Sequence, residues 1–372
     1  MQPVLHRKLI AGVRHVLLFF RQSVMIVSVQ SGIVLARYCA HDPDLRKRKE
    51  EYMKIIDMHC DTLLECYQKK QPLRNGPYQI NLEKLKKGGC LAQCFAIFVV
   101  SHDTADRCGI SLAPYDFYLE MAELYRKEIE NNPDLIAPAL CAEDIAKNQA
   151  KGLMSSILTI EDAVAVDGRI ERIDEFFADG VRMMSLTWNY ENCIGYPNSV
   201  DPRLHAKGLK SFGIQAVERM NELGMIIDVS HLTEGGFDDA IRLSSKPLIA
   251  SHSCARALGS HQRNLTDRQL KLLGEKGGIV GINFCAPFLE DHAVLSSIEN
   301  IVKHMVYIKE KAGIEALAWG SDLDGIDGSI LEYEDYAGFP RILEALSMHF
   351  KPDELDRINH GNFLRVFRDN AG

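Results

Sequence analysis

The sequence has no excess of positive charge: 43 Lys and Arg residues against 51 Asp and Glu residues give a formal net charge of −8. Nucleic-acid binding depends on clustered positive charge that neutralises phosphates, so we expect no nucleic-acid partner. The ten cysteines include no Cys-x-x-Cys pair, which argues against a zinc ribbon and against the disulfide framework of a small secreted domain. We therefore expect reduced thiols in a cytoplasmic protein.

A long hydrophobic run is also missing. Within residues 1–52 the longest stretch without charge, residues 22–36, is shorter than the roughly 20 apolar residues that a membrane span needs. Arg21 divides the apolar residues, and no signal-peptide cleavage pattern follows them. We predict that residues 1–52 are a poorly ordered N-terminal extension or reflect a mistaken upstream start, and that residues 53–372 form one domain. Membrane contact is not expected; membrane association through residues 1–52 is the alternative to a cytoplasmic location.

Nucleotide-binding glycine motifs are absent as well: no GxGxxG follows the first apolar run, and there is no GxxxxGKS or GxxxxGKT. The sequence instead contains short apolar runs that alternate with polar clusters and amphipathic helical stretches. Eight runs have this character: 54–58, 91–100, 156–160, 181–187, 225–229, 247–250, 278–284 and 316–319. Helices are predicted over 115–131, 213–223, 267–276 and 297–311. Eight strand–helix repeats predict an α/β fold, a (β/α)₈ TIM-like barrel with insertions, with a doubly wound open sheet as the alternative.

Residues that commonly bind metals follow five of these eight runs. In a barrel of this kind the carboxyl ends of all strands converge on one face, so residues far apart in sequence would share one cleft. Imidazole and carboxylate groups are suitable ligands for zinc or another divalent ion. A single aspartate after a strand would more often be a helix cap, but the ordered set favours a metal site. The set comprises His59, Asp61, Glu161, His231, His252 and Asp322.

The spacing of these residues indicates how they could share two metal ions. His59 and Asp61 are two residues apart, which places their side chains on the same face of an extended strand end. The carboxylate of Glu161 could bridge two ions about 3.5–4 Å apart, and the ions would share a water, lower its pKa and clamp an attacked carbonyl. Asp322 needs no ligand role and is placed to take a proton from that water and pass it to a leaving amine.

The ordered motifs resemble those of the membrane dipeptidase (renal dipeptidase) family, a branch of the amidohydrolase superfamily, over roughly residues 53–368. The matching segments are DMHCDT (57–62), ILTIED (157–162), SLTWNYEN (185–192), GLKSFG (208–213), IIDVSH (226–231), ASHS (250–253), QRNLTD (262–267), INFCAPF (282–288), GSDLDG (320–325) and GNFLRVF (361–367). The resemblance implies a (β/α)₈ barrel with a binuclear zinc site that hydrolyses dipeptides, including those with a C-terminal D-residue. It also implies a homodimer.

The resemblance assigns a role to each candidate residue. Asp322 would be the catalytic acid/base, and the guanidinium fork of Arg263 would bind the substrate carboxylate. Two zinc ions are the implied cofactor, although other divalent metals would suit the same ligands. The implied metal ligands are His59 and Asp61 for one ion, His231 and His252 for the other, and Glu161 between them.

Two positions depart from the family pattern. Relatives carry a histidine after Leu-Thr at the end of the fourth strand, where this chain has Trp188 followed by Asn189. Either Asn189 supplies the hydrogen bond to the scissile carbonyl, or the metal pair alone polarises that carbonyl. Phe288 stands where relatives have a tyrosine, which removes a hydroxyl, and losing one oxyanion donor can lower turnover about 10²–10³-fold. Residues 188, 189 and 288 are therefore candidate substrate contacts.

Two other functions remain open at the level of sequence. The chain could be another amidohydrolase-type enzyme that acts on an N-acyl amino acid, a lactone or a cyclic amide. It could also be a metal-binding scaffold without catalysis, an alternative that Trp188 supports and that the intact Asp322 opposes. Zinc-dependent turnover of a dipeptide would separate these alternatives.

Overall fold

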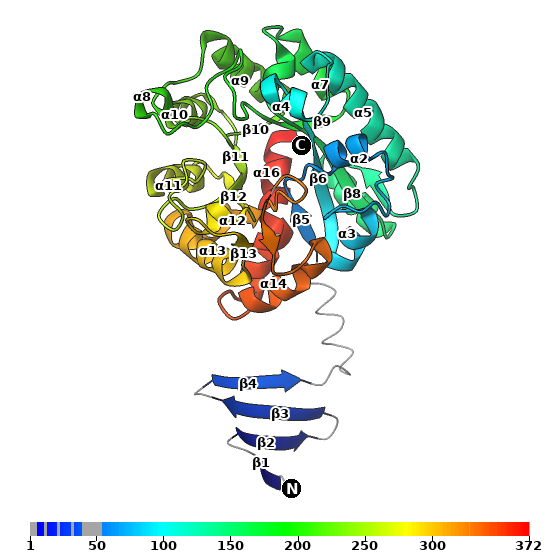
Figure 1. Cartoon of the computed structure of the whole chain (residues 1–372), viewed down its shortest axis with the longest axis vertical. Helices are drawn as coiled ribbons and strands as arrows, with labels where there is room; N and C mark the ends of the chain where they lie inside the picture. The colour runs from blue at the N-terminus through cyan, green and yellow to red at the C-terminus, as the bar shows by residue number, and fades with distance from the viewer. Residues whose placement is uncertain are drawn as a thin grey trace. The chain divides into compact units, whose positions relative to one another are not determined.

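The computed structural model describes residues 6–10, 13–20, 23–30, 33–38, 54–326 and 328–371. The chain divides into two compact units, Met1–Tyr52 and Met53–Gly372 (Figure 1). None of the helices in the described part of the chain is both long enough and apolar enough to span a membrane.

The first unit contains a small antiparallel sheet. Its strands, in sheet order, are β1 (His6–Ile10), β2 (Val13–Phe20), β3 (Ser23–Gln30) and β4 (Ile33–Tyr38). The connecting residues and residues 39–53 lie outside the described residues. The prediction that residues 1–52 are a poorly ordered extension or reflect a mistaken start therefore stays a prediction.

The second unit is built around a closed ring of parallel strands. The ring runs β6-β5-β14-β12-β11-β10-β9-β8, and the pairing of β6 with β8 closes it. A short strand, β7 (Ile136–Pro138), pairs with the start of β8. This arrangement confirms the predicted (β/α)₈ barrel. The ring strands are β5 (Ile55–Asp57), β6 (Cys90–Phe98), β8 (Met154–Glu161), β9 (Val181–Ser185), β10 (Ile226–Asp228), β11 (Ile249–Ser253), β12 (Ile279–Ile282) and β14 (Leu317–Trp319).

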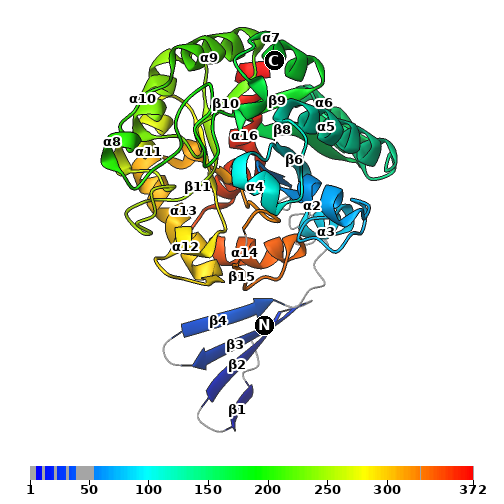
Figure 2. The ribbon, with the colours of Figure 1, turned by 45° about the horizontal axis from the view of Figure 1, so that its top comes forward.

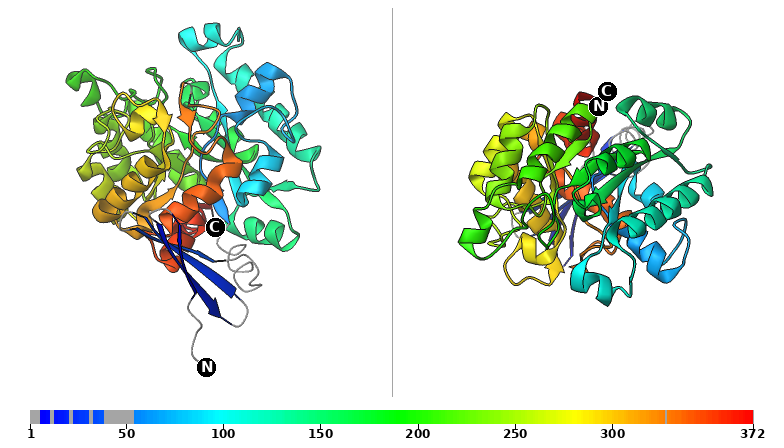
Figure 3. Two further views of the ribbon diagram at one scale, coloured as in Figure 1. Left: turned by 60° about the horizontal axis from the view of Figure 1, so that its bottom comes forward. Right: turned by 90° about the horizontal axis from the view of Figure 1, so that it is seen from above.

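Helices surround these strands (Figures 2 and 3). The four predicted helices are present as α5 (Pro114–Glu130), α9 (Ser211–Leu223), α11 (Asp267–Glu275) and α13 (Ile298–Ala312). The other α-helices of the described residues are α2 (Thr62–Lys69), α3 (Leu82–Gly88), α4 (His102–Arg107), α6 (Ala142–Ala150), α7 (Glu171–Ala178), α8 (Pro202–His205), α10 (Glu234–Leu243), α12 (Ala286–Leu289), α14 (Phe339–Leu346), α15 (Pro352–Asp356) and α16 (Asn362–Ala371). The insertions include a two-stranded sheet of β13 (Leu295–Ser296) and β15 (Ile330–Leu331).

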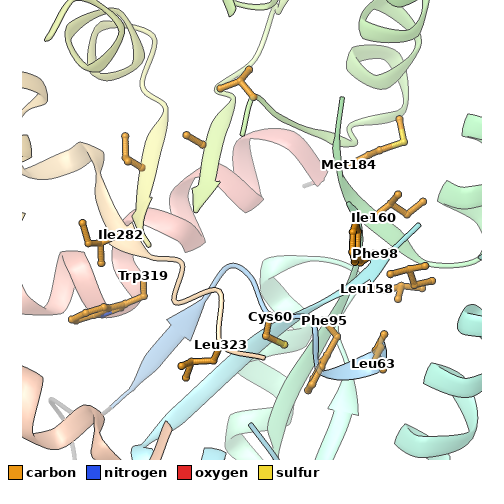
Figure 4. Packing of buried hydrophobic residues seen from close by; sticks show 14 of the residues in the cluster. Cys60, Leu63, Phe95, Phe98, Leu158, Ile160, Met184, Ile282, Trp319 and Leu323 are labelled. Carbon is orange, nitrogen blue, oxygen red and sulfur yellow. The ribbon is translucent and has the colours of Figure 1, made fainter. Parts of the chain in front are cut away.

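Two apolar clusters fill the barrel domain. Alternate side chains of each strand point to opposite faces, so one set packs outward against the helices, as Phe95 and Leu158 do in Figure 4. The other set, which includes Ala92 and Ile157, lies in a separate cluster with Phe363 and Phe367 of α16. Because α16 packs on the ring with apolar residues, the polar side chains that follow the carboxyl ends of the strands are left to build a site at the opposite end.

Candidate active site

Four strand ends of the ring present the predicted metal-binding residues to one place, and of these strands only β10 and β11 are adjacent. His59 and Asp61 follow β5, and Glu161 is the last residue of β8. His231 follows β10, and His252 lies within β11. All five are buried, none being more than 9% exposed. The structure thus brings together side chains that are separated by up to almost 200 residues in the sequence.

Glu161 lies between two groups of these side chains. Its Oε2 is 3.4 Å from Nε2 of His59, which is also 3.8 Å from Oδ1 of Asp61 and 3.8 Å from Oδ1 of Asp322. Its Oε1 is 2.9 Å from Nε2 of His231 and 3.4 Å from Nε2 of His252. Each oxygen of one carboxylate therefore faces a different half of the site.

The donor atoms on the His231 side leave a position that suits a cation. Asn189 Oδ1 lies 3.1 Å from Nδ1 of His231 and can accept its proton. Ser251 Oγ lies 2.7 Å from Nδ1 of His252 and can accept likewise. With both protons on Nδ1, two Nε2 lone pairs face each other 3.0 Å apart beside a carboxylate oxygen. Such a set is stabilised by a positive ion between its members.

Three buried carboxyl groups surround His59, although burial disfavours charged carboxylates. Nε2 of His59 and Oδ1 of Asp61 are buried and have no hydrogen-bond partner among the described residues. Burial lowers the pKa of His59, but Glu161, Asp61 and Asp322 outweigh it and raise that pKa to about 10. Burial, together with Glu161, raises the pKa of Asp61 well above its ordinary value. Both shifts show that positive charge is favoured here, and the donor set fits a divalent metal ion.

The pKa values of His231, His252 and Glu161 are also shifted. Burial lowers the pKa of His231 to about 4, and burial together with His59 lowers the pKa of His252 well below its usual range. Both rings are therefore neutral at pH 7, as metal-binding imidazoles must be. Burial raises the pKa of Glu161, but His59 and the other two imidazoles outweigh it, so that this pKa lies well below its ordinary value. Glu161 is thus an ionised carboxylate.

Asp322 lies at the edge of the candidate metal site. It follows β14, its amide donates to the His59 carbonyl oxygen over 3.1 Å, and its Oδ2 accepts a 2.8 Å hydrogen bond from Nδ2 of Asn283. Burial raises the pKa of Asp322 to about 6, an increase that Glu161 supports and His59 opposes. A carboxyl group with a pKa near neutrality can both accept and release a proton at working pH.

Two of these side chains stand on left-handed backbone. The φ angle is 69° at His231 and 60° at Asp322, a region that residues other than glycine seldom adopt. Each residue turns the chain sharply just after its strand, which carries its side chain over the end of the ring. Backbone of this kind costs roughly 1–3 kcal/mol per residue and occurs often at functional sites.

Gly325 leaves the space that the two carboxylates occupy. A Cβ atom at this position would overlap Oδ2 of Asp61 and would lie 2.6 Å from Oδ1 of Asp322. We expect Gly325→Ala to displace both carboxylates and to lower metal-dependent activity about 10²-fold, since a shift of about 1 Å can have that effect. Gly195→Ala is the matched control, because its nearest neighbour would lie at 3.4 Å, an ordinary contact. Circular dichroism must show both variants folded; equal activities would contradict the prediction.

Arg263 is buried with unpaired hydrogen-bond donors. Its Nη1 donates to Ser253 Oγ over 2.9 Å, while Nε and Nη2 have no partner among the described residues. The side chain is only 4% exposed, and burial lowers its pKa from the usual value. Two unpaired donor nitrogens of a buried guanidinium, one N–H from each lying parallel, suit an anionic group such as a carboxylate. Phe288, the third candidate substrate contact, packs against His261, two residues before Arg263, with ring centres 4.6 Å apart and the ring planes tilted by 39°.

Trp188 and Asn189 both approach His231. The Trp188 ring centre is 4.7 Å from that of Phe98 and 6.2 Å from that of His231. Asn189 engages Nδ1 of the same histidine, so in this structure its side chain oxygen is directed at an imidazole. The prediction that Asn189 binds the substrate stays a prediction.

Several residues that support this site carried no role in the sequence analysis. Asn283 holds Asp322, Ser253 holds Arg263, and Gly325 gives the carboxylates room. A signal existed for Asn283, because it is a polar residue inside the apolar run predicted over residues 278–284, close to the carboxyl end of that run. Ser253 follows the predicted run 247–250, but its contact with Arg263 depends on how the loop after β11 folds back, which the sequence pattern does not show.

Comparison with known proteins identifies the family of this chain. The sequence profile of the membrane dipeptidase family (peptidase family M19) matches residues 46–371. An uncharacterized Klebsiella pneumoniae protein from the pqqA 5′ region is 33% identical over 266 residues, 69% of this chain and 97% of that protein. Dipeptidase 3 of Mus musculus is 29% identical over 343 residues, 88% of this chain and 67% of that protein.

The barrel is also similar to the solved structure of a metallopeptidase. A Rhodobacter sphaeroides metallopeptidase, liganded with a phosphinate mimic of the dipeptide L-Ala-D-Ala, is 25% identical with a TM-score of 0.77. The match covers 85% of this chain and 99% of that chain. The family profile spans all described residues of the barrel unit, 54–326 and 328–371. This protein therefore belongs to the membrane dipeptidase family, peptidase family M19.

Proposed function

We propose that this protein hydrolyses dipeptides, including those with a C-terminal D-residue, in a site that holds two divalent metal ions, with zinc as the expected metal. The observation that carries the proposal is the position of Glu161, whose Oε2 lies 3.4 Å from His59 and whose Oε1 lies 2.9 Å from His231. The proposed ligands are His59 and Asp61 on one side, His231 and His252 on the other, and Glu161 between them. Bound divalent ions polarise a carbonyl oxygen and lower the pKa of water.

Arg263 is the proposed binding residue for the substrate. The free carboxylate of a dipeptide would accept the two N–H donors that Arg263 leaves unpaired. A substrate that ends at this carboxylate places its single peptide bond a fixed distance from the guanidinium. The D-residue tolerance is supported by the Rhodobacter sphaeroides relative, which is liganded with a mimic of L-Ala-D-Ala.

Asp322 is the proposed proton carrier. Asn283 fixes Oδ2 of Asp322 by a 2.8 Å hydrogen bond, which leaves Oδ1 on the side of His59. A carboxylate held there can take a proton from the attacking water and deliver it to the nitrogen of the departing amine. Bond cleavage then releases two amino acids, one of which stays paired with Arg263 until it dissociates.

Metal removal tests the proposal directly. We expect dialysis against a chelator to abolish hydrolysis of L,L- and L,D-dipeptides, and added Zn²⁺ to restore it. The reason is that the proposed mechanism relies on bound metal ions to polarise the scissile carbonyl and to lower the pKa of the attacking water. Dipeptides amidated at the C-terminus should react poorly, since they lack the carboxylate for Arg263. Turnover of N-acyl amino acids or lactones in place of dipeptides would identify another hydrolase activity. Bound zinc without turnover of any of these substrates would indicate a non-catalytic scaffold.

A further inference from the structure

A buried group of polar side chains lies beneath His252. Asp228 is the last residue of β10, and Ser251 precedes His252 in β11. Asp228, Ser230, Ser251 and His252 are each at most 1% exposed. Buried polar groups are usually hydrogen-bonded to one another, so the partners of each group can be followed in turn.

The carboxylate of Asp228 organises the group. Its Oδ1 accepts the amides of Ser230 (2.9 Å) and Ser251 (2.8 Å). Its Oδ2 accepts the hydroxyl of Ser185 and, over 2.6 Å, the hydroxyl of Ser251. The hydroxyl of Ser230 also lies 3.2 Å from that of Ser251. Because the carboxylate oxygen of Asp228 is the closer acceptor, at 2.6 Å, the single proton of the Ser251 hydroxyl is directed at Asp228.

The assignment then extends to the imidazole. Ser251 Oγ lies 2.7 Å from Nδ1 of His252. Because the Ser251 proton is engaged with Asp228, the serine oxygen can only accept from Nδ1, so the ring proton sits on Nδ1. Nε2 keeps its lone pair, and Nε2 is the atom that faces His231 and Glu161. The sequence of bonds runs from ring N–H to hydroxyl to carboxylate.

We propose that Ser251 is a positioning residue that uses Asp228 to hold His252 in the tautomer and orientation required for metal binding. The proposal rests on the metal site in the proposed function and deepens it. Carboxylates commonly accept the second ring N–H of a metal-binding histidine, and here a serine hydroxyl transmits that effect. The backbone around Ser251 is also closely packed. A Cβ atom at Gly281 of β12, or at Gly320 directly after β14, would overlap the carbonyl oxygen of Ser251 in β11.

A second serine–aspartate pair in the barrel provides an internal control. Ser321 donates its amide (2.8 Å) and its hydroxyl (2.5 Å) to Asp57. The hydroxyl of Ser321 accepts the amide of Leu323 over 3.4 Å instead of a ring nitrogen. Ser321 and Ser251 are both 0% exposed. Removing either hydroxyl therefore removes the same chemical group from the same kind of environment, but only Ser251 contacts an imidazole.

The test compares Ser251→Ala with Ser321→Ala in the full chain. Zinc affinity is measured by competition with a chromophoric chelator, without substrate. We expect Ser251→Ala to weaken one of two zinc sites about 10–100-fold, because His252 loses the acceptor that fixes its ring. Ser321→Ala should stay within about threefold of the wild type. Equal losses in both variants, or no loss in Ser251→Ala, would overturn the proposal.

A measurement on the wild-type chain covers the case in which Ser251→Ala fails to fold. After chelation, ¹⁵N chemical shifts of histidine-labelled protein report which ring nitrogen carries the proton, with His252 identified by the signal missing from His252→Gln. A proton on Nδ1 supports the proposal, and a proton on Nε2 refutes it. If the wild-type protein binds no zinc at all, the proposed function fails instead, so the two failures are distinguishable.

Discussion

Asp322→Asn is expected to lower dipeptide turnover about 10²–10⁴-fold while the protein keeps its fold and its metal. The substitution removes the group that can accept a proton but preserves the size of the side chain. Asparagine also adopts left-handed backbone readily, so φ of 60° at this position remains accessible. Turnover number and metal content, measured on the same sample, check the prediction.

Asp324→Asn is the matched control for that experiment. Asp324 lies two residues away, has φ of 69°, and bonds to Thr62 and to the amides of Gln79 and Ile80. Its loss should lower stability without removing a group that contacts His59. Comparable loss of turnover in both variants, or full activity in Asp322→Asn, would refute a proton-transfer role for Asp322.

Arg263→Lys is expected to raise KM for dipeptides about 10²-fold with a smaller change in kcat. A buried lysine ammonium cannot present the parallel pair of N–H donors that Nε and Nη2 of Arg263 offer. Truncating one partner of a buried charge pair costs about 2–5 kcal/mol, which covers this range. Steady-state kinetics over a range of dipeptide concentrations measure both constants.

The substrate itself supplies the control for the Arg263 prediction. A dipeptide amidated at its C-terminus lacks the carboxylate, so wild type and Arg263→Lys should hydrolyse it at rates that differ by little. The effects of the Arg263→Lys substitution and of substrate amidation on the rate are then not additive, as expected for two groups in direct contact. If Arg263→Lys lowers the hydrolysis of both substrates equally, Arg263 supports the loop after β11 and does not bind the carboxylate.

The barrel strands could be predicted because their apolar runs are bounded by polar residues. The C-terminal limit of β11 could not be predicted in this way. Hydropathy ends the run at Ala250, whereas β11 continues to Ser253 and contains His252. The polar residues of this segment stay inside the strand because Asp228, from the neighbouring strand, accepts hydrogen bonds from Ser251. Such compensation depends on a contact between residues 23 positions apart, which local patterns do not contain.

The candidate metal-binding residues could be predicted for a related reason. A parallel barrel brings the carboxyl ends of its strands to one face, so position along each strand is enough to group His59, Glu161 and His231. The side-chain contacts that orient them require distances between loops. The approach of Asn189 to Nδ1 of His231 is one example, and the hydrogen bond from Asn283 to Asp322 is another.

The left-handed backbone at His231 and Asp322 has a consequence for engineering. Glycine would relax both turns, so a screen for heat resistance alone would favour mutations that erase the histidine and the carboxylate. Thermostability would thus compete with the proposed metal binding of His231 and the proposed proton transfer by Asp322. Efforts to make this enzyme more robust should therefore modify the outer helices and leave the strand-end turns unaltered.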